Sequence, residues 1–164
     1  MGPPPARRPP IEGSYLIIGE GKGDAAFFGH LCEVRGINDF RIEEAGGTGK
    51  LEEYLKGLSS RTNFDHLKAI LLVADNDDTP AESFNRIRVY LKRAGLPTPH
   101  AQLKVARNRP EELAVVVMMV PYTNAGGPTR GCLETLLQPA IDYHRPQVKT
   151  CVDTYFKCFM EASY

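Results

Sequence analysis

The chain has 164 residues, 42% of them hydrophobic, so it is long enough to bury a core and is most simply one domain. Its 20 basic and 20 acidic residues cancel, which argues against binding nucleic acid through bulk positive charge. The four cysteines lack metal-ligand spacing, and no apolar run approaches the roughly 20 residues of a membrane helix; we therefore expect reduced thiols, no membrane segment and a cytoplasmic protein.

Residues 1–13 are predicted to be a disordered, proline-rich leader, because five of the chain's 13 prolines lie in its first ten positions. A strand is predicted at 15–20, followed by a glycine-rich turn and a helix that closes at Gly36. A second strand is predicted at 40–45. The glycine-rich segment 46–50 and a helix over 51–58 follow it.

The stretch from 67 to 80 is the most informative. Residues 69–74 (AILLVA) are apolar without alternation, which predicts a strand buried on both faces, and Pro80 suits the first turn of a helix that runs to Gly95. A short strand is predicted at 102–106. A further buried strand at 113–121 leads through a loop to a helix that begins near Cys132.

The end of the chain, residues 139–164, is predicted to be a helical extension. Its large apolar residues have helical spacing, which indicates either a shortened chain or a face that packs on another copy, as in a homo-oligomer: Val148, Val152, Tyr155, Phe156 and Phe159. Strands alternate with helices along the rest of the chain. The sequence therefore predicts a single α/β, Rossmann-like domain over 14–138, with a mostly parallel sheet of four or five strands and helices on both faces.

Acidic residues follow two of the predicted strands: Glu20 and Asp24 after the first, Asp75 and Asp77 after the third. Ligands bind at the carboxyl ends of strands in open α/β sheets, and four neighbouring carboxylates would repel unless a cation neutralised them. Oxygen ligands suit Mg²⁺ or Mn²⁺. The alternative is that the aspartates only cap helices, although Glu20 would be a poor cap.

Four segments in this order resemble the Toprim fold of topoisomerases, DnaG-type primases and overcoming-lysogenisation-defect (OLD) nucleases: LIIGEGKGD, AGGTGKLEEYL, ILLVADNDD and VPYTNAGGPTRGCLETLL. The similarity is greatest to a stand-alone, DUF3226-type set of Toprim-like proteins and spans roughly residues 14–138. The resemblance implies that Glu20, Asp75 and Asp77 are the signature acids of that fold. In its nuclease branch a further acid corresponds to Asp24, and a Ser-x-Glu segment corresponds to Cys132-Leu133-Glu134.

What the resemblance implies is a Mg²⁺-dependent phosphodiester or phosphoryl-transfer enzyme acting on DNA or RNA, with a nuclease as the favoured activity. Its metal ligands would be Asp75, Asp77, Asp24 and Glu134, and Glu20 would be a further ligand or the acid or base. A thiol is a poor Mg²⁺ ligand, so Cys132 is a departure that bears on a second metal ion. The alternative is a Toprim-like module that binds a nucleotide or a partner without catalysis.

Two other segments have open interpretations. The segment 46–50 lacks the first glycine and the final Ser or Thr of a nucleoside-triphosphate loop, so Thr48 and Lys50 either hold a substrate phosphate or lie in a solvent-exposed turn. Lys104, Arg107 and Arg109 either contact a nucleic-acid backbone or are solvated. A receiver-like domain with Asp75 as phospho-acceptor is disfavoured, because Gly19-Glu20 stands where receivers have paired acids.

Overall fold

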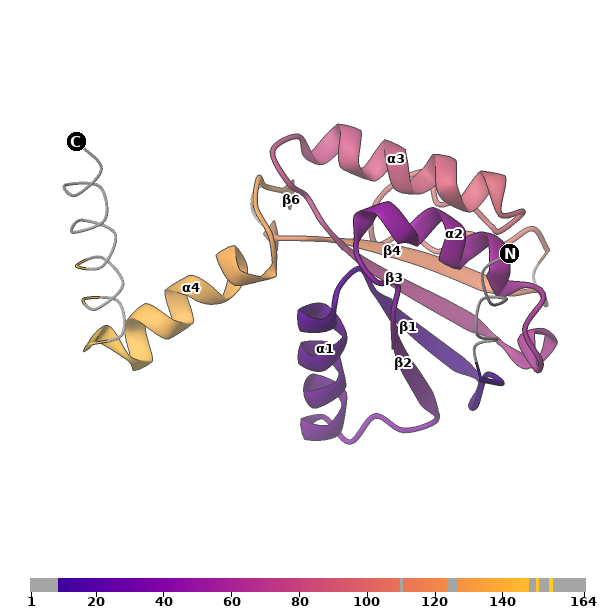
Figure 1. The fold of residues 1–164 in the computed structure, drawn as a ribbon, viewed down its shortest axis with the longest axis horizontal. Helices are drawn as coiled ribbons and strands as arrows, with labels where there is room; N and C mark the ends of the chain where they lie inside the picture. The colour runs from indigo at the N-terminus through magenta and orange to yellow at the C-terminus, as the bar shows by residue number, and fades with distance from the viewer. Residues whose placement is uncertain (1–8, 110, 124–126, 148–149, 151–153, 155–164) are drawn as a thin grey trace, which may run out of the picture.

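The computed structural model describes residues 9–109, 111–123, 127–147, 150 and 154. It is an α/β domain (Figure 1). The elements in chain order are β1 (Tyr15–Gly19), α1 (Lys22–Val34), β2 (Phe40–Glu44), α2 (Thr48–Leu58), the 3₁₀ helix η1 (Phe64–His66), β3 (Ala69–Asp75), α3 (Pro80–Arg93), β4 (Ala114–Val120), the hairpin strands β5 (Tyr122–Thr123) and β6 (Gly127–Pro128), and α4 (Leu133–His144).

The main sheet has four strands in the order β2-β1-β3-β4, and all its neighbouring pairs are parallel. The predicted fold class, a mostly parallel sheet within one Rossmann-like domain, is confirmed. The predicted strand at 102–106 is wrong. Leu103 has a φ of 58°, which interrupts an extended backbone, and the segment forms only an isolated antiparallel bridge between Ala106 and Val115.

Helices lie on both faces of the sheet because its strands are apolar on both faces (Figure 1). In β1, Leu16 and Ile18 pack into the core beneath α2 and α3, whereas Ile17 packs beneath α1. The larger core, on the side of α2 and α3, also contains Leu51, Leu55, Leu72, Ile87, Leu91, Val117 and Met119. The smaller core contains Phe28, Cys32, Val73, Val120 and Leu133.

The chain reverses its direction across the sheet between β1 and β3. It passes from β1 outward to β2 and then returns past β1 to β3, so β1 and β3 become neighbours in the centre of the sheet. Gly19 is in register with Val73, and the Glu20 N–H donates to the Val73 carbonyl at 2.9 Å. The carboxyl ends of two such strands border the crevice in which α/β proteins bind ligands.

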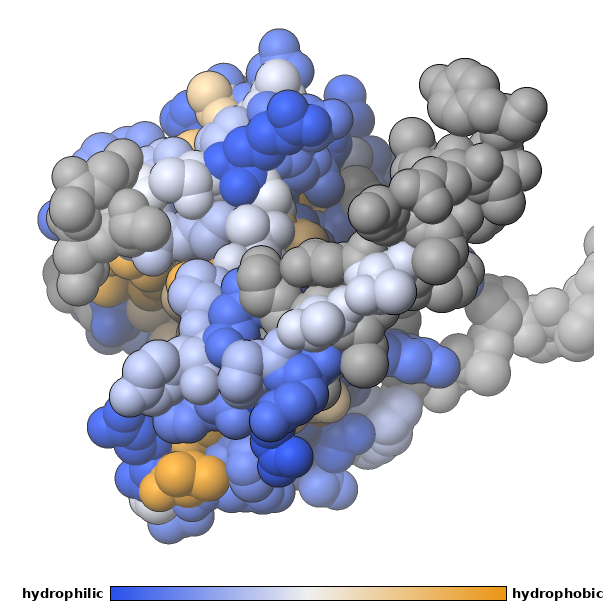
Figure 2. All heavy atoms as spheres, turned by 90° about the vertical axis from the view of Figure 1, so that its left-hand side faces the viewer, coloured by the Kyte–Doolittle hydropathy of each residue, from blue (hydrophilic) through white to orange (hydrophobic). Residues whose placement is uncertain are grey.

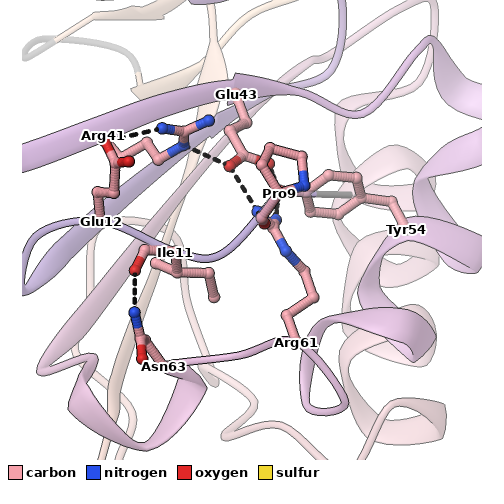
Figure 3. Close-up of polar contacts among 8 residues, drawn as sticks. All are labelled: Pro9, Ile11, Glu12, Arg41, Glu43, Tyr54, Arg61 and Asn63. Carbon is pink, nitrogen blue, oxygen red and sulfur yellow. Dashed lines mark hydrogen bonds and ion pairs between the residues drawn. The ribbon is translucent and has the colours of Figure 1, made fainter. Parts of the chain in front are cut away.

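The described part of the predicted leader is ordered against the domain, which corrects the boundary expected at residue 14. Ile11 is almost wholly buried and belongs to the larger core. Its N–H donates to the Thr62 carbonyl at 3.1 Å. The Asn63 side chain donates to the Ile11 carbonyl, also at 3.1 Å (Figure 3). A single apolar residue among prolines does not reveal this docking. Residues 1–8 lie outside the described residues.

A buried ion pair joins Glu43 of β2 to Arg61, which lies just after the end of α2 and also binds the N-terminal segment (Figure 3). Two nitrogens of the Arg61 guanidinium donate to the Glu43 carboxylate at 2.7 and 2.8 Å, and the side chains of Arg61 and Glu43 are only 7% and 9% exposed. Arg61 also donates to the Pro9 carbonyl at 2.7 Å. Burial alone would raise the pKa of Glu43, but hydrogen bonds from Arg61, Arg41 and Tyr54 outweigh it and lower that pKa to about 2.

Helix α4 crosses the boundary predicted between residues 138 and 139 and continues to His144, with Pro139 inside it. In Figure 1 it leads away from the sheet. The apolar residues predicted to line the extension, from Val148 to Phe159, lie outside the described residues. Among the described helices, none combines the length and the apolar character needed to cross a membrane.

Candidate functional site

The turn from β1 into α1 is unusually close. A Cβ atom on Gly19 would lie 2.7 Å from the Ala25 nitrogen and 2.9 Å from the Asp24 Cβ, so only glycine fits without movement of the backbone. This turn holds the first turn of α1 directly against the end of β1. The buried side chains of Glu20 and Asp24 are thereby brought to the same edge of the sheet.

Asp24 both caps its helix and belongs to a cluster of acids. Its carboxylate accepts the Gly21 N–H at 2.9 Å, as the capping interpretation predicts. Burial is the main cause that raises the pKa of Asp24, and the nearby carboxyls of Glu20 and Glu134 raise it further, against the lowering effect of the Gly21 N–H. The Asp24 side chain therefore caps α1 and also belongs to the cluster of acids.

Asp75, at the end of β3, lies beside Glu20. Its backbone N–H donates to the Glu20 carboxylate at 3.2 Å, and its own carboxylate accepts the Leu133 N–H at 3.1 Å. Burial first, then the charges of Asp24, Glu20 and Glu134, raise the pKa of Asp75 to about 6, although the Leu133 N–H lowers it. The Asp75 carboxyl thus interacts electrostatically with three other acids, which come from two other segments of the chain.

Glu134, in the first turn of α4, is the fourth member of this group. A Cβ on Gly23 would be 4.0 Å from a Glu134 carboxylate oxygen, so the first turns of α1 and α4 face each other. A hydrogen bond from the Cys132 thiol is the main cause that lowers the pKa of Glu134. We refer to Glu20, Asp24, Asp75 and Glu134 as the carboxylate cluster.

The Asp77 carboxylate forms its hydrogen bonds with α3 and not with the carboxylate cluster. Its carboxylate accepts from Arg86 at 2.8 Å and from the Ser83 hydroxyl at 3.3 Å, both on α3. Its backbone has a φ of 51° and exchanges two hydrogen bonds with Gly131, at 3.0 and 2.9 Å. As placed, Asp77 fixes the loop before α4.

Asn76 is a residue whose role the sequence did not suggest. It is completely buried, and its side-chain amide donates to the carbonyls of Pro121 and Thr129 at 2.7 and 2.8 Å. These bonds clamp both ends of the loop that connects β4 with α4. An amide in a run of aspartates is the only sequence signal, and it does not reveal which carbonyls the amide would meet.

The glycine-rich segment lies at the same edge of the sheet as the carboxylate cluster. Gly46 and Gly47 have φ values of 97° and 98°, and the Gly47 N–H donates to the Glu20 carbonyl at 2.8 Å. The exposed Lys50 lies in the first turn of α2, and its stem passes over Gly46. The side chain of Thr48 lies outside the described part, and a phosphate role for Thr48 and Lys50 stays a prediction.

The basic residues Arg107 and Arg109 lie elsewhere. They precede β4, so they are at the amino edge of the sheet, opposite the carboxylate cluster. Arg107 donates to the Glu112 carbonyl at 2.9 Å, and Arg109 pairs with the Glu112 carboxylate at 3.4 Å. These contacts favour the solvated interpretation of the basic segment.

The members of the carboxylate cluster interact through their charges, but their side chains do not converge on one point. As the side chains lie, no group of three His, Cys, Asp or Glu residues in the described part is arranged to hold a metal ion. Glu134 is exposed and unbranched, so its side chain has room to rotate. The donors are all carboxylate oxygens, the ligand type that Mg²⁺ and Mn²⁺ prefer.

We expect Gly19→Ala to destabilise the protein by about 1–3 kcal/mol, because the new methyl group would push the start of α1 away from β1. Urea unfolding followed by circular dichroism measures the change. Gly57→Ala in α2 is the matched control: its Cβ would meet nothing within 4 Å, and the substitution should be neutral or stabilising. Equal stabilities of the two variants would contradict the close approach at Gly19.

Comparison with known proteins identifies a family. A family model described as "Protein of unknown function (DUF3226)" matches residues 14–162, which is most of the chain and includes all four members of the carboxylate cluster. Neither the curated proteins nor the solved structures contain a significant match to the chain.

Proposed function

Because this chain belongs to the DUF3226 family, whose description gives no function, we propose from its own residues that it is a Mg²⁺- or Mn²⁺-dependent enzyme that cleaves phosphodiester bonds in DNA or RNA. The site of the reaction is the carboxylate cluster at the crevice between β1 and β3. The similarity of four segments of the sequence to segments of Toprim nucleases supports this proposal. A cytoplasmic location also stays a prediction.

The gathering of acidic side chains around Asp75 is the observation that carries the proposal. Asp24, Glu20 and Glu134 all raise the pKa of Asp75, although they come from segments far apart in the sequence. Gathering such charges costs folding free energy, and perturbed carboxyls in a crevice are typical of functional sites. A cation that binds among them would remove the repulsion.

Each member of the carboxylate cluster has a distinct role in this proposal. Asp75, Asp24 and Glu134 would supply carboxylate oxygens to the cation, since the exposed Glu134 side chain has room to rotate. The bound cation would neutralise the substrate phosphate and lower the pKa of a water molecule. Glu20, oriented by the Asp75 N–H, either joins the ligands or transfers the proton. Thr48 and Lys50 would contact a phosphate at the neighbouring N-terminus of α2.

Calorimetric titration with MgCl₂ and MnCl₂, followed by cleavage assays on single- and double-stranded DNA and RNA, tests the proposal. Wild type should bind the cation, and Glu20→Gln and Asp24→Asn should lower cleavage at least about 100-fold. Asp78→Asn is the matched control, since Asp78 is exposed and pairs with Arg130. Asp77 is also a predicted metal ligand. Weaker cation binding by Asp77→Asn than by wild type would show that the Asp77 carboxylate exchanges its bond with Arg86 for one with the cation. Absence of cation binding by wild type would reject the proposal.

The second candidate is a nucleotide- or partner-binding module without catalysis. Cys132 favours it, because the thiol stands where the resembling nucleases have serine and donates to Glu134. Cation and oligonucleotide binding without any cleavage would support this alternative. Cys132→Ser would then be expected to leave the absence of turnover unchanged.

A further inference from the structure

The main sheet ends in a polar surface. Figure 2 views the molecule from the side at which the parallel strands end in Figure 1, and most of the coloured residues on that face are hydrophilic. The carboxylate cluster lies at this edge, and Ser83 and Arg86 of α3 contact Asp77 in the loop that follows β3. Because the chain has no net charge, local basic groups of this kind have to hold any phosphate.

Ser83 and Arg86 hold the Asp77 carboxylate as they would hold another oxyanion. The Arg86 Nη2 donates to one carboxylate oxygen at 2.8 Å, and the Ser83 hydroxyl donates to the same oxygen at 3.3 Å. Arg86 also donates to the Ser83 hydroxyl at 3.4 Å, so the two donors lie side by side. Ser83 is only 1% exposed, and a buried hydroxyl needs an acceptor. A guanidinium beside a hydroxyl suits the oxygens of a phosphate group equally well.

The ion pair of Asp77 with Arg86 is easier to break than the buried ion pair described above. One nitrogen of Arg86 donates to Asp77, whereas Arg61 in the buried pair uses two nitrogens. The side chains of Arg86 and Asp77 are 36% and 50% exposed, so solvent screens their attraction. No hydrogen bond to a described residue uses the Nη1 of Arg86, and this nitrogen can donate to a second oxygen of a phosphate.

The backbone of Asp77 does not depend on that ion pair. Asp77 exchanges two backbone hydrogen bonds with Gly131, and its φ of 51° is one that aspartate and asparagine adopt more readily than most residues. Rotation of the side chain is therefore enough to take the carboxylate away from Arg86 while the loop stays in place. Asp77 lies two residues after Asp75 of the carboxylate cluster and is itself a predicted ligand of the cation.

We infer that Arg86 and Ser83 form a second site, which binds a phosphate group of the substrate when Asp77 turns toward the cation. The inference takes its substrate, a phosphodiester of DNA or RNA, from the proposed function and rests on it. Departure of Asp77 and arrival of phosphate are coupled, because the two donors lose their acceptor in the first step and regain one in the second. Without substrate, the Asp77 carboxylate stands in for the phosphate.

Titration of inorganic phosphate into metal-free, ¹⁵N-labelled protein tests the site without the cation, with the backbone amide resonance of Ser83 as the reporter. Asp77→Asn frees Arg86 and should bind phosphate at least about tenfold more tightly than wild type. The gain should vanish in Asp77→Asn/Arg86→Met. Asp78→Asn is the matched control: it removes the same charge from the neighbouring residue, which pairs with Arg130, and should show no such gain.

Cleavage kinetics with MnCl₂ distinguish a phosphate of the substrate from free phosphate. Arg86→Met should raise KM for an oligonucleotide at least about tenfold and leave kcat nearly unchanged, because the site binds a phosphate that does not react. Arg93→Met, which removes an exposed arginine farther along α3, should change neither constant. Circular dichroism establishes that each variant is folded, and Arg86→Gln replaces Arg86→Met if the latter is not.

The two measurements separate this inference from the proposed function. If wild type binds no cation, the proposed function fails, and the phosphate titration still decides whether the site exists. A phosphate affinity of Asp77→Asn equal to that of wild type, or a gain that persists without Arg86, would overturn the inference alone. A gain that depends on Arg86 but leaves KM unchanged in Arg86→Met would also overturn it, because the site would then bind a free anion only.

Discussion

Asp75→Asn is expected to stabilise the metal-free protein at pH 7 and, on the proposed function, to abolish its stabilisation by Mg²⁺. Burial and three neighbouring carboxyls raise the pKa of Asp75 to about 6, so its ionised form weakens the fold. Asparagine removes the charge and keeps an oxygen to accept the Leu133 N–H. We expect a gain on the order of 1–2 kcal/mol in thermal or urea unfolding, after allowance for partial solvent screening.

The pH dependence of this gain follows from the direction of the shift. The folded protein holds the Asp75 proton more tightly than the unfolded chain, so the contribution of Asp75 to stability falls as pH rises from about 3.8 to about 6. The advantage of Asp75→Asn should vanish at the lower limit and be complete above the upper one. Asp77→Asn, which loses its Arg86 pair, should instead be neutral or slightly destabilising. A less stable Asp75→Asn at pH 7 would contradict the arrangement of the cluster.

Arg61→Met is expected to cost about 3 kcal/mol of unfolding free energy. It leaves the buried Glu43 carboxylate without its bidentate partner and removes the bond to the Pro9 carbonyl. Urea unfolding measures the loss. Arg93→Met is the matched control, because the Arg93–Glu52 pair lies at the surface and should contribute less than about 1 kcal/mol.

The ion pair between Arg61 and Glu43 predicts a pH dependence of stability opposite in sign to that of Asp75. The pKa of Glu43 falls from 4.5 in its ordinary state to about 2 in the fold, so the stability it contributes is complete above about pH 4.5 and is lost as pH falls toward 2. The loss should amount to about 3 kcal/mol at most. In Arg61→Met the acid transition of stability should be smaller. An unchanged transition in that variant would show that Glu43 does not depend on Arg61.

Much of the fold could be predicted from local patterns. The continuous apolar run 69–74 is the central strand β3, and Pro80 begins α3 as its fixed φ favours. Two errors have physical causes that the sequence does not display. Ile11 reaches the core because Arg61 and Asn63, about 50 residues away, bind the backbone beside it, and Leu103 takes a left-handed conformation in a segment with strand-like composition.

The candidate site could be predicted in part. Glu20, Asp24 and Asp75 converge because parallel strands end at one edge, which the topology alone implies. The direction of the Asp77 side chain could not be predicted, because it depends on a left-handed backbone that pairs with Gly131 more than 50 residues away. The clamp made by Asn76 likewise depends on carbonyls in a distant loop.

The hydrogen bond from Leu133 to Asp75 has a consequence for the order in which the structure forms. Leu133 is the first residue of α4, so a carboxylate 58 residues earlier in the chain serves as the acceptor that a neighbouring capping residue would ordinarily provide. Helix α4 is therefore not an autonomous folding unit. Its first turn should become protected from amide exchange only after β3 has formed, and it should fray first whenever β3 opens.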